Sequence, residues 1–276
     1  MISKLFLFSI LLMLNFKANA QFDDYHLIFS EEFNYRGLPD EEKWNYEEGY
    51  VRNMEPQYYT KKRKKNARVK NGNLIIEGRK ESIKNSFYKR GSTHWRNSPK
   101  RTQYTSASLN TLGNFSFQYG FVEVKAKLPE GKGVWPAIWM LGTDVNEVEW
   151  PFSGEIDIME FVGKDEKHVH GTVHYPANNE EKYASSGSKL PVEDLHDDFH
   201  IFGLNWTKDK IEFYFDRQLY HTFLIEEAGE MAYIFRKPYY LLINLALGGG
   251  WAGELDESIL PQQFLIDYVR VYKPGE

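Results

Sequence analysis

The chain has 276 residues, a formal net charge of −5 and no cysteine. A mildly acidic protein is a poor candidate for nucleic-acid binding. Without cysteines no disulfide can stabilise the fold, so it has to be held by a large hydrophobic core. Aromatic residues make up 16 % of the chain; they favour strands, and they also supply flat faces that stack on ligands.

Residues 1–20 have the layout of a secretory signal peptide. Lys4 precedes an apolar stretch from Leu5 to Leu14, and Ala18-Asn19-Ala20 forms a small-x-small cleavage site. This stretch is short for a membrane span, and no second long apolar segment follows. We therefore expect no membrane span, and we expect residues 21–276 to be exported and to be periplasmic, cell-surface or secreted.

Strand-like patterns dominate this mature part. Roughly eleven or twelve candidate strands can be counted, with turn signals between them, no internal repeat and no linker. Helical patterns are scarce: 192–199 and 226–235 each predict a short helix or turn. We therefore expect one all-β domain over 21–276, built as a β-sandwich. The clearest strands are expected at 73–80, 120–128, 210–223, 239–249 and 264–273.

Three of these segments carry a more detailed prediction. In 120–128, Val122 and Val124 alternate with Glu123 and Lys125, which is typical of a strand with one solvent-facing side. The segment 210–223 reads as a hairpin that turns at 216–218. The first part of 239–249 is apolar throughout, as a central strand buried on both faces would be.

A dense basic run, KKRKK, occupies residues 61–65. In a cytosolic protein it could indicate nuclear import or a phosphate contact. Behind a signal peptide, we expect a solvated loop instead.

The stretch GEIDIMEF at 154–161 places three acids, Glu155, Asp157 and Glu160, in an apolar run. A helix would separate Glu155 from the other two. A regular strand would put Glu155 and Asp157 on one face and Glu160 on the other. If Ile158 and Met159 together occupy one inward position as a β-bulge, Glu160 returns to the face of the other acids. We therefore predict a bulge at 158–159, with Ile156 and Phe161 also buried.

Three acids on one strand face can perform acid–base and nucleophilic chemistry. Glu155 and Glu160 would lie roughly 6–7 Å apart along the backbone. Their side chains can converge to the roughly 5–5.5 Å typical of retaining glycosidases. Asp157 between them would keep the two glutamates in different protonation states. The alternative is a solvent-facing acidic strand without chemistry, because the spacing ExDxxE is short and common.

Together with further motifs, the stretch GEIDIME makes the sequence resemble glycoside hydrolase family 16. GEIDIME matches the active-site signature of that family at every position. The similarity covers nearly all of the mature chain, in the family's order. It rests on eight stretches: IFSEEFNY (28–35), NMEPQYYT (53–60), YTSASL (104–109), GVWPAIWML (133–141), GEIDIME (154–160), GTVHYP (171–176), YYLLINLALGGGW (239–251) and IDYVRVYK (266–273). The resemblance implies a β-jelly-roll sandwich of the concanavalin A-like kind, with two antiparallel sheets and a concave substrate cleft.

The resemblance also implies roles for individual residues. Glu155 matches the catalytic nucleophile, Asp157 the assisting acid and Glu160 the general acid/base. His174, on the strand after the signature strand, matches a histidine that lines the cleft near the acid/base. Its alternative is a buried structural histidine bonded to the backbone.

Other matched positions would bind the polysaccharide. Trp135, Trp139 and Trp251 match aromatic residues that line the glucan-binding groove, and Trp150 is a further candidate. Without the resemblance, each tryptophan on a strand would be interpreted as core. The resemblance further places Asn53 and Glu55 in the subsites on the non-reducing side, where hydrogen bonds to hydroxyls fix the sugar.

Many members of the family bind calcium on the convex face, far from the cleft. Here Asp267 matches the side-chain ligand, with backbone oxygens near Glu32 and Gly72 completing the site. No metal or other cofactor is expected to take part in the chemistry.

The sequence departs from the family at Ser108. Many laminarinase-like members read YTSAR or YTSGR, where this chain reads YTSAS. If that arginine contacts sugar in the relatives, the corresponding subsite differs here.

Three functions are weighed from these residues. The preferred one is an endo-acting, retaining glycosidase of β-1,3- and/or mixed-linkage β-1,3-1,4-glucans, expected to be a monomer with β-glucan as its partner. The second is a non-catalytic glucan-binding module of the lectin type. The third is a metal-dependent hydrolase in which Glu155, Asp157, Glu160 and His174 hold the metal. Within the family, galactan- or xyloglucan-acting branches are less similar, and laminarin against mixed-linkage glucan stays open.

Overall fold

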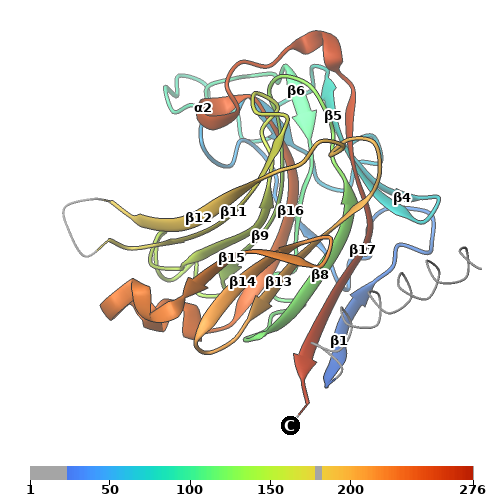
Figure 1. The fold of residues 1–276 in the computed structure, drawn as a ribbon. Coiled ribbons are helices and arrows are strands. Elements are labelled where there is room, and N and C mark those ends of the chain that lie inside the picture. The colour runs from blue at the N-terminus through green and yellow to red at the C-terminus, as the bar shows by residue number, and fades with distance from the viewer. Residues whose placement is uncertain (1–23, 178–181, 276) are drawn as a thin grey trace, which may run out of the picture.

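The computed structural model describes residues 24–177 and 182–275, which form two sheets packed face to face (Figure 1). The ten-stranded sheet has the order β15-β14-β13-β8-β17-β5-β6-β3, with β1 beside β17 and β4 beside β5; the seven-stranded sheet has the order β12-β11-β10-β9-β16-β7-β2. The strands are β1 (Tyr25–Glu31), β2 (Asn45–Tyr46), β3 (Gln57–Tyr59), β4 (Ala67–Lys70), β5 (Asn73–Lys80), β6 (Tyr104–Ser106), β7 (Ser108–Asn110), β8 (Gly120–Lys127), β9 (Val134–Gly142), β10 (Glu155–Glu160), β11 (His168–Tyr175), β12 (Ala184–Pro191), β13 (His200–Trp206), β14 (Lys210–Phe215), β15 (Gln218–Leu224), β16 (Tyr239–Leu247) and β17 (Gln262–Pro274).

The described residues thus form more strands than the roughly eleven or twelve predicted from alternation. The additional strands include β2, β3, β6 and β7, which have only two or three residues each. So short a segment cannot display a period of two. The β3–β6 pair is also parallel, whereas every other pair of named strands in the described residues is antiparallel, as expected of both sheets.

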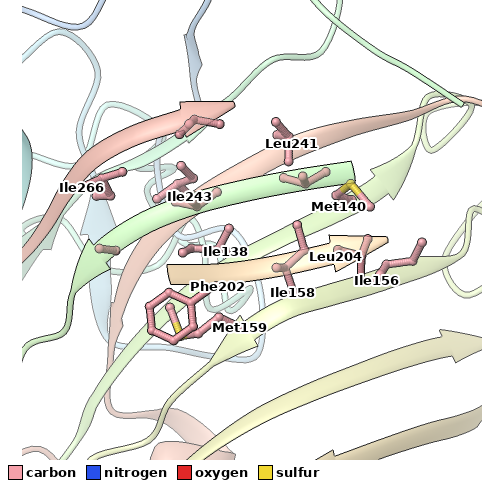
Figure 2. Close-up of a cluster of buried hydrophobic side chains, with 14 of the residues drawn as sticks. Ile138, Met140, Ile156, Ile158, Met159, Phe202, Leu204, Leu241, Ile243 and Ile266 are labelled. Carbon is pink, nitrogen blue, oxygen red and sulfur yellow. The ribbon is translucent and has the colours of Figure 1, made fainter. Parts of the chain in front are cut away.

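The hydrophobic core lies between the two sheets. Inward-facing side chains from alternate strand positions interdigitate there, which is how a sandwich buries enough apolar area without disulfides. Figure 2 shows a part of this core with side chains from both sheets. The seven-stranded sheet contributes Ile138, Met140, Ile156, Ile158, Met159, Leu241 and Ile243, and the ten-stranded sheet contributes Phe202, Leu204 and Ile266.

Several local predictions are confirmed. All of β16 is buried, as expected for a central strand. The hairpin β14–β15 turns at Asp216 and Arg217, whose φ angles of 46° and 66° are those of a tight two-residue hairpin turn. The segment 225–236 forms 3₁₀ turns, together labelled η2 (Ile225–Arg236), which are interrupted by a kink at Gly229, and 192–199 forms a turn. Two shorter helices are α2 (Gly249–Ala252) and η3 (Glu257–Ile259).

The predicted solvent-facing side of 120–128 is wrong at Glu123. This residue is only 4 % exposed. The hydroxyl of Tyr268 donates to its carboxylate at 2.6 Å, and the Nε of Arg217 lies 3.5 Å from the other oxygen. Cross-strand partners therefore cover a face that alternation alone assigns to water.

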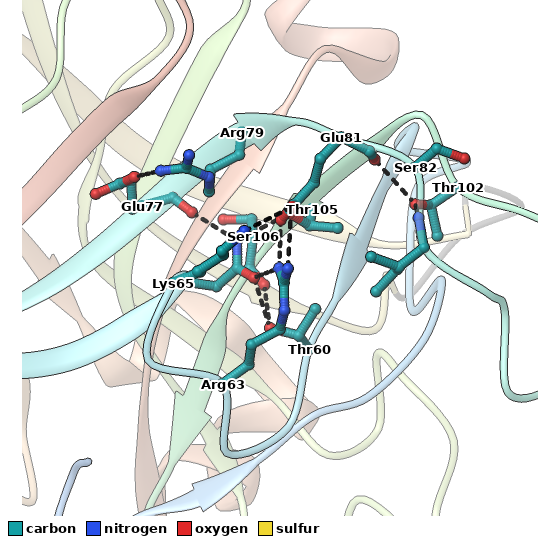
Figure 3. A network of polar contacts seen from close by, with 12 residues as sticks. Thr60, Arg63, Lys65, Glu77, Arg79, Glu81, Ser82, Thr102, Thr105 and Ser106 are labelled. Atoms are coloured by element: carbon teal, nitrogen blue, oxygen red, sulfur yellow. Dashed lines mark hydrogen bonds and ion pairs between the residues drawn. The ribbon is translucent and has the colours of Figure 1, made fainter. Parts of the chain in front are cut away.

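The basic run 61–65 lies in the loop between β3 and β4. Its four lysines are exposed, as predicted for a solvated loop, but Arg63 is half-buried. Arg63 pairs with Glu81 and donates to Asn66 at 2.7 Å; Figure 3 shows its contacts within the polar network. The run thus combines a solvated surface with one structural anchor.

The predicted signal peptide, residues 1–20, lies outside the described residues. Within the described ranges, no helix is long and apolar enough to cross a membrane.

Candidate active site

A second apolar cluster lies on the outer face of the seven-stranded sheet. It consists of Ala137, Trp139, Leu141, Tyr240 and Leu242 from β9 and β16. Because successive strand residues point to opposite faces, these side chains alternate with the core residues of the same strands. A cavity of about 350 Å³ lies over this cluster. It is lined by Arg52, Asn53, Glu55, Trp135, Ala137, Trp139, Leu141, Trp150, Glu155, Asp157, Glu160, Asn244 and Ala246.

The β-bulge predicted in β10 is confirmed. Against β9, Asp157 pairs with Trp139 and Met159 with Ile138, so Ile158 is the extra residue. The register with β11 shifts by one residue over the same interval. Both bulge side chains are buried, with Ile158 1 % and Met159 0 % exposed.

The bulge brings all three acids to the cavity, as expected from the alternation of side chains along the strand. Glu155 and Glu160 are half-buried, whereas Asp157 is only 1 % exposed. Ile156 and Phe161 are fully buried on the other side.

Burial is the main influence on the protonation of the acids. It raises the pKa of Glu155 to about 8, with repulsion by Asp157 adding to the effect. Burial also raises the pKa of Asp157 to about 8. The pKa of Glu160 is raised well above its usual value by burial and then by repulsion from the other two acids. Glu160 is therefore the acid best placed to hold a proton near neutrality.

Two of the three acids have a close polar neighbour. The indole nitrogen of Trp135 donates to Oε1 of Glu160 at 3.0 Å. Nε2 of His174 lies 3.2 Å from Oδ2 of Asp157. These contacts hold two of the carboxyl groups in fixed orientations.

His174 is not among the residues that line the cavity, and it lies beside Glu155 and Asp157 rather than beside Glu160. It pairs directly with Glu155 across β10 and β11, whereas His170 is the histidine opposite Glu160. Nδ1 of His174 has no hydrogen-bond partner among the described residues, so no backbone bond supports the structural alternative.

The tryptophans form two aromatic groups on either side of the acids. The rings of Trp135 and Trp251 pack edge to face, with 5.3 Å between their centroids, and the ring centroid of Trp251 lies 5.1 Å from that of His170. On the Glu155 side, Trp150 lies 6.4 Å from His174 and is 42 % exposed. Trp139 lies between the groups on the cavity floor and is only 6 % exposed.

The polar side of the cleft is a hydrogen-bonded chain. Asn53 donates to Glu55 at 3.1 Å, and Gln57 donates to the other oxygen of Glu55 at 2.6 Å. Asn244 accepts from the indole of Trp139 at 2.7 Å and donates to the hydroxyl of Tyr59 at 3.1 Å. Asn53 and Glu55 line the cavity, and their hydrogen bonds to sugar hydroxyls stay a prediction.

The sequence did not predict Arg52 and Asn244, which line the cavity, or Glu47 and His170, which adjoin Arg52 and Glu160. His170 could have been found, since it is four residues from His174 in one strand and therefore on the same face. Arg52 lies in an irregular loop, where no period indicates the direction of a side chain.

Ser108, the position that departs from the family pattern, faces the cleft side of the seven-stranded sheet. It pairs with Asn244 across β7 and β16, and its hydroxyl donates to the carboxylate of Glu47.

The three segments predicted to hold calcium adjoin one another in the ten-stranded sheet, around β17. Asp267 lies at a register shift in β17, between Ile266, which pairs with Leu74, and Val269, which pairs with Glu31. The segments of Gly72 and Glu32 therefore adjoin that of Asp267. However, the carboxylate of Asp267 is paired with Lys125 at 2.8 Å, and that of Glu32 with Arg270 at 2.8 Å.

A sandwich with carboxylic acids over a tryptophan-lined cavity has the features of a glycoside hydrolase. The comparisons with known proteins agree with this class. Residues 54–270 match the family model "Glycosyl hydrolases family 16". The chain belongs to this family, and its fold is the β-jelly-roll sandwich expected from the sequence.

Relatives within the family are close over nearly the whole chain. A beta-glucanase of Rhodothermus marinus is 40 % identical over 97 % of this chain and 93 % of its own. The X-ray structure of the laminarinase from Rhodothermus marinus has a TM-score of 0.79 and 41 % identity, over 91 % of this chain and 98 % of its own. A structure from work on endo-acting O-glycanases of the human gut microbiota that initiate mucin breakdown has a TM-score of 0.84 and 36 % identity, over 91 % and 92 %.

Proposed function

We propose that the chain is an endo-acting, retaining glycosidase that cleaves β-1,3- and/or mixed-linkage β-1,3-1,4-glucans. The observation that carries the proposal is the bulge in β10, which turns Glu155, Asp157 and Glu160 to one cavity. The relatedness to beta-glucanases and laminarinases supports the substrate class.

The reaction would follow double displacement. Glu155 attacks the anomeric carbon while Glu160 donates its proton to the leaving oxygen, so the glycosidic bond breaks as a glycosyl ester forms. Glu160 then takes a proton from water, whose oxygen attacks the same carbon and releases Glu155. The bond from Trp135 orients Glu160, and Asp157 with His174 supports the nucleophile.

A substitution at Glu155 tests the assignment. Glu155→Ala should reduce the release of reducing ends from laminarin and barley glucan below a few per cent of wild type, because no carboxylate remains to attack. Thermal unfolding should stay cooperative. Glu147→Ala, an exposed acid in the preceding loop, is the control and should keep full activity. Activity of Glu155→Ala above that level would refute the role of Glu155.

The same assay addresses the two other classes. A non-catalytic module would release no reducing ends from any glucan. A metal-dependent hydrolase is also worth testing, since ligand atoms of Glu155, Asp157 and His174 lie within 4.8 Å of one another. We expect activity to persist in excess chelator, measured well below the unfolding temperature.

A mucin-type glycan is the second candidate substrate. It is favoured by the TM-score of 0.84 to the structure from the work on O-glycanases, against 0.79 for the laminarinase. Initial rates on laminarin, barley glucan and mucin O-glycans, measured side by side, decide between the two.

We further propose that residues 21–276 act as one exported, monomeric domain. The pairing of β1 with β17, at opposite ends of the described chain, supports a single folding unit. The signal-peptide pattern of residues 1–20 supports export.

Calcium binding at Asp267 is also a proposal. The adjacency of the three predicted segments supports it, and the pairing of Asp267 with Lys125 opposes it, since an ion would have to displace the ammonium group.

A further inference from the structure

Arg52 is the one basic side chain among the described residues that line the cavity. It belongs to the loop between β2 and β3, and its guanidinium lies over the ring of Trp139, with Cζ 4.8 Å from the ring centre. Trp139 pairs with Asp157 across β9 and β10. Arg52 therefore lies over the same cavity floor as the three acids, on the side of that floor nearer to β16 and β7.

The guanidinium is held in place by two residues behind it. Nη2 of Arg52 donates to both carboxylate oxygens of Glu47, and the hydroxyl of Ser108 donates to the same carboxylate. The side chain of Arg52 is 23 % exposed and that of Glu47 20 %. A side chain fixed in this way loses little further rotamer entropy when a ligand binds.

The guanidinium still has an unused donor. Nη1 of Arg52 is buried and has no hydrogen-bond partner among the described residues, so a sugar can accept from it only if the exposed part of the side chain turns toward the ligand. Asn53 and the carboxylate of Glu55 line the same part of the cavity. Donors and acceptors are thus gathered beside an aromatic face, which suits the hydroxyls and the apolar face of a sugar ring.

Charge indicates which kind of sugar would fit. The positive charge of Arg52 is already neutralised by Glu47, and Glu55, Glu155, Asp157 and Glu160 line the same cavity. A sulfate or carboxylate on the sugar would find no unpaired cation among the described residues that line the cavity, and any of the acids that is ionised would repel it. The cavity is therefore suited to an uncharged sugar.

We propose that Arg52 is a specificity-determining residue, which donates to the hydroxyls of a neutral sugar bound over Trp139, next to the three acids on the β16 side. This inference rests on the proposed glycosidase function and adds the residue that selects the sugar. Glu47 and Ser108 act as positioning residues for the guanidinium.

Steady-state kinetics of Arg52→Gln and Arg52→Lys on laminarihexaose test the proposal. A hydrogen bond from a charged donor contributes enough that Arg52→Gln should lower kcat/KM by about 10- to 100-fold, mainly through KM. Arg52→Lys should recover only part of the loss, because an ammonium cannot lie flat on Trp139 while bonding both oxygens of Glu47. Wild type should also prefer a neutral β-1,3-glucan over its carboxymethylated form.

Arg96→Gln is the matched control. Arg96 donates to the carbonyls of Tyr50 and Val51 at 3.0 and 3.1 Å, so it supports the same loop, and it is not among the residues that line the cavity. Its removal should change kcat/KM by less than about threefold, as expected for a loss at an exposed position away from the site.

Each result of these kinetic measurements either supports or overturns the proposed role of Arg52. The inference is overturned if Arg52→Gln behaves like Arg96→Gln, if its loss lies in kcat with KM unchanged, or if wild type cleaves the carboxymethylated glucan equally well. If Arg52→Gln does not fold, the same criteria apply to Arg52→Lys. If wild type cleaves laminarin but the Arg52 variants do not behave as expected, the proposed glycosidase function is kept and the role of Arg52 is rejected. If wild type cleaves no β-glucan, the proposed function and the role of Arg52 are both rejected.

Discussion

Asp157 is the most deeply buried acid of the site, at 1 % exposure, between two glutamates that have to act differently. Its Oδ2 lies 3.2 Å from Nε2 of His174 and has no hydrogen-bond partner among the described residues. A buried carboxylate with so little compensation costs folding free energy, which is common where a group is retained for chemistry.

Asp157→Asn should therefore make the protein more stable and less active. The folded-state pKa of Asp157 is raised to about 8 from an ordinary 3.8, so its favourable contribution is complete below pH 3.8 and is lost as the pH rises through about 8. We expect the amide to stabilise by about 1–2 kcal/mol at pH 8–9 and by less at pH 4. Denaturant unfolding at both pH values measures this.

Glu230→Gln, at an exposed acid, is the control and should show no such pH dependence. An Asp157→Asn protein that is less stable than wild type at pH 8 would contradict the prediction.

Among individual residues, the sequence predicted those that strand alternation or a motif identifies. The three acids follow from one short stretch, because strand alternation leaves a bulge as the only way to gather them. Arg52 and Glu47 could not be predicted, because their direction depends on contacts with Trp139 and Ser108, which are remote in sequence.

Among the elements, the loop 61–66 joins β3 and β4 through Arg63. Besides pairing with Arg63, Glu81 accepts a hydrogen bond from Thr105 at 2.6 Å (Figure 3). The hydrogen bond from Arg63 lowers the pKa of Glu81 to about 2. An exposed basic run thus contains one residue that ties the loop to the ten-stranded sheet.

Arg63→Ala should destabilise the protein by about 1–3 kcal/mol at pH 7, because it leaves the half-buried Glu81 with only Thr105 and the more distant Lys65 as partners. Since the folded-state pKa of Glu81 is lowered, its contribution is present above about pH 4.5 and is lost as the pH falls through about 2. The difference from wild type should therefore narrow in acid, as measured by denaturant unfolding from pH 7 to pH 2.

Lys64→Ala, at an exposed neighbour in the same run, should cost almost nothing. A difference between Arg63→Ala and wild type that stays constant down to pH 2 would exclude the Glu81 pair as its cause.

Element predictions succeeded where a strand is long and failed where it is short or covered. The buried β16 and the hairpin β14–β15 were evident from their patterns, whereas β2, β3, β6 and β7 are too short to show one. The side of β8 that carries Glu123 looked solvent-facing because a sequence does not reveal Tyr268 and Arg217 across it.

Over the whole molecule, the middle strands β9 and β16 of the seven-stranded sheet are buried on both faces, and the two faces have different functions. One packs against the ten-stranded sheet, and the other is the cavity floor. The cavity is thus built on the middle of the sandwich, and loops add Arg52, Asn53, Glu55 and Trp150 to its lining.

The proposed calcium ion would act at this scale, by joining β1, β5 and β17. If it binds, the unfolding temperature should rise by a few degrees in millimolar calcium relative to chelator, because a ligand of the folded state alone stabilises it. Asp267→Asn should remove the difference. Equal unfolding temperatures in calcium and in chelator would show that Lys125 keeps the carboxylate of Asp267.

The bulge in β10 also has a consequence for how this strand can change by insertion and deletion. Losing either Ile158 or Met159 would restore a regular strand in which all three acids still face outward, so a deletion of one codon preserves the set of reactive groups. It would nevertheless remove a buried side chain from the core and straighten the strand. Insertion or loss of one residue here can therefore alter the spacing of the acids without changing which of them face the cavity, a route to altered chemistry that no single substitution offers.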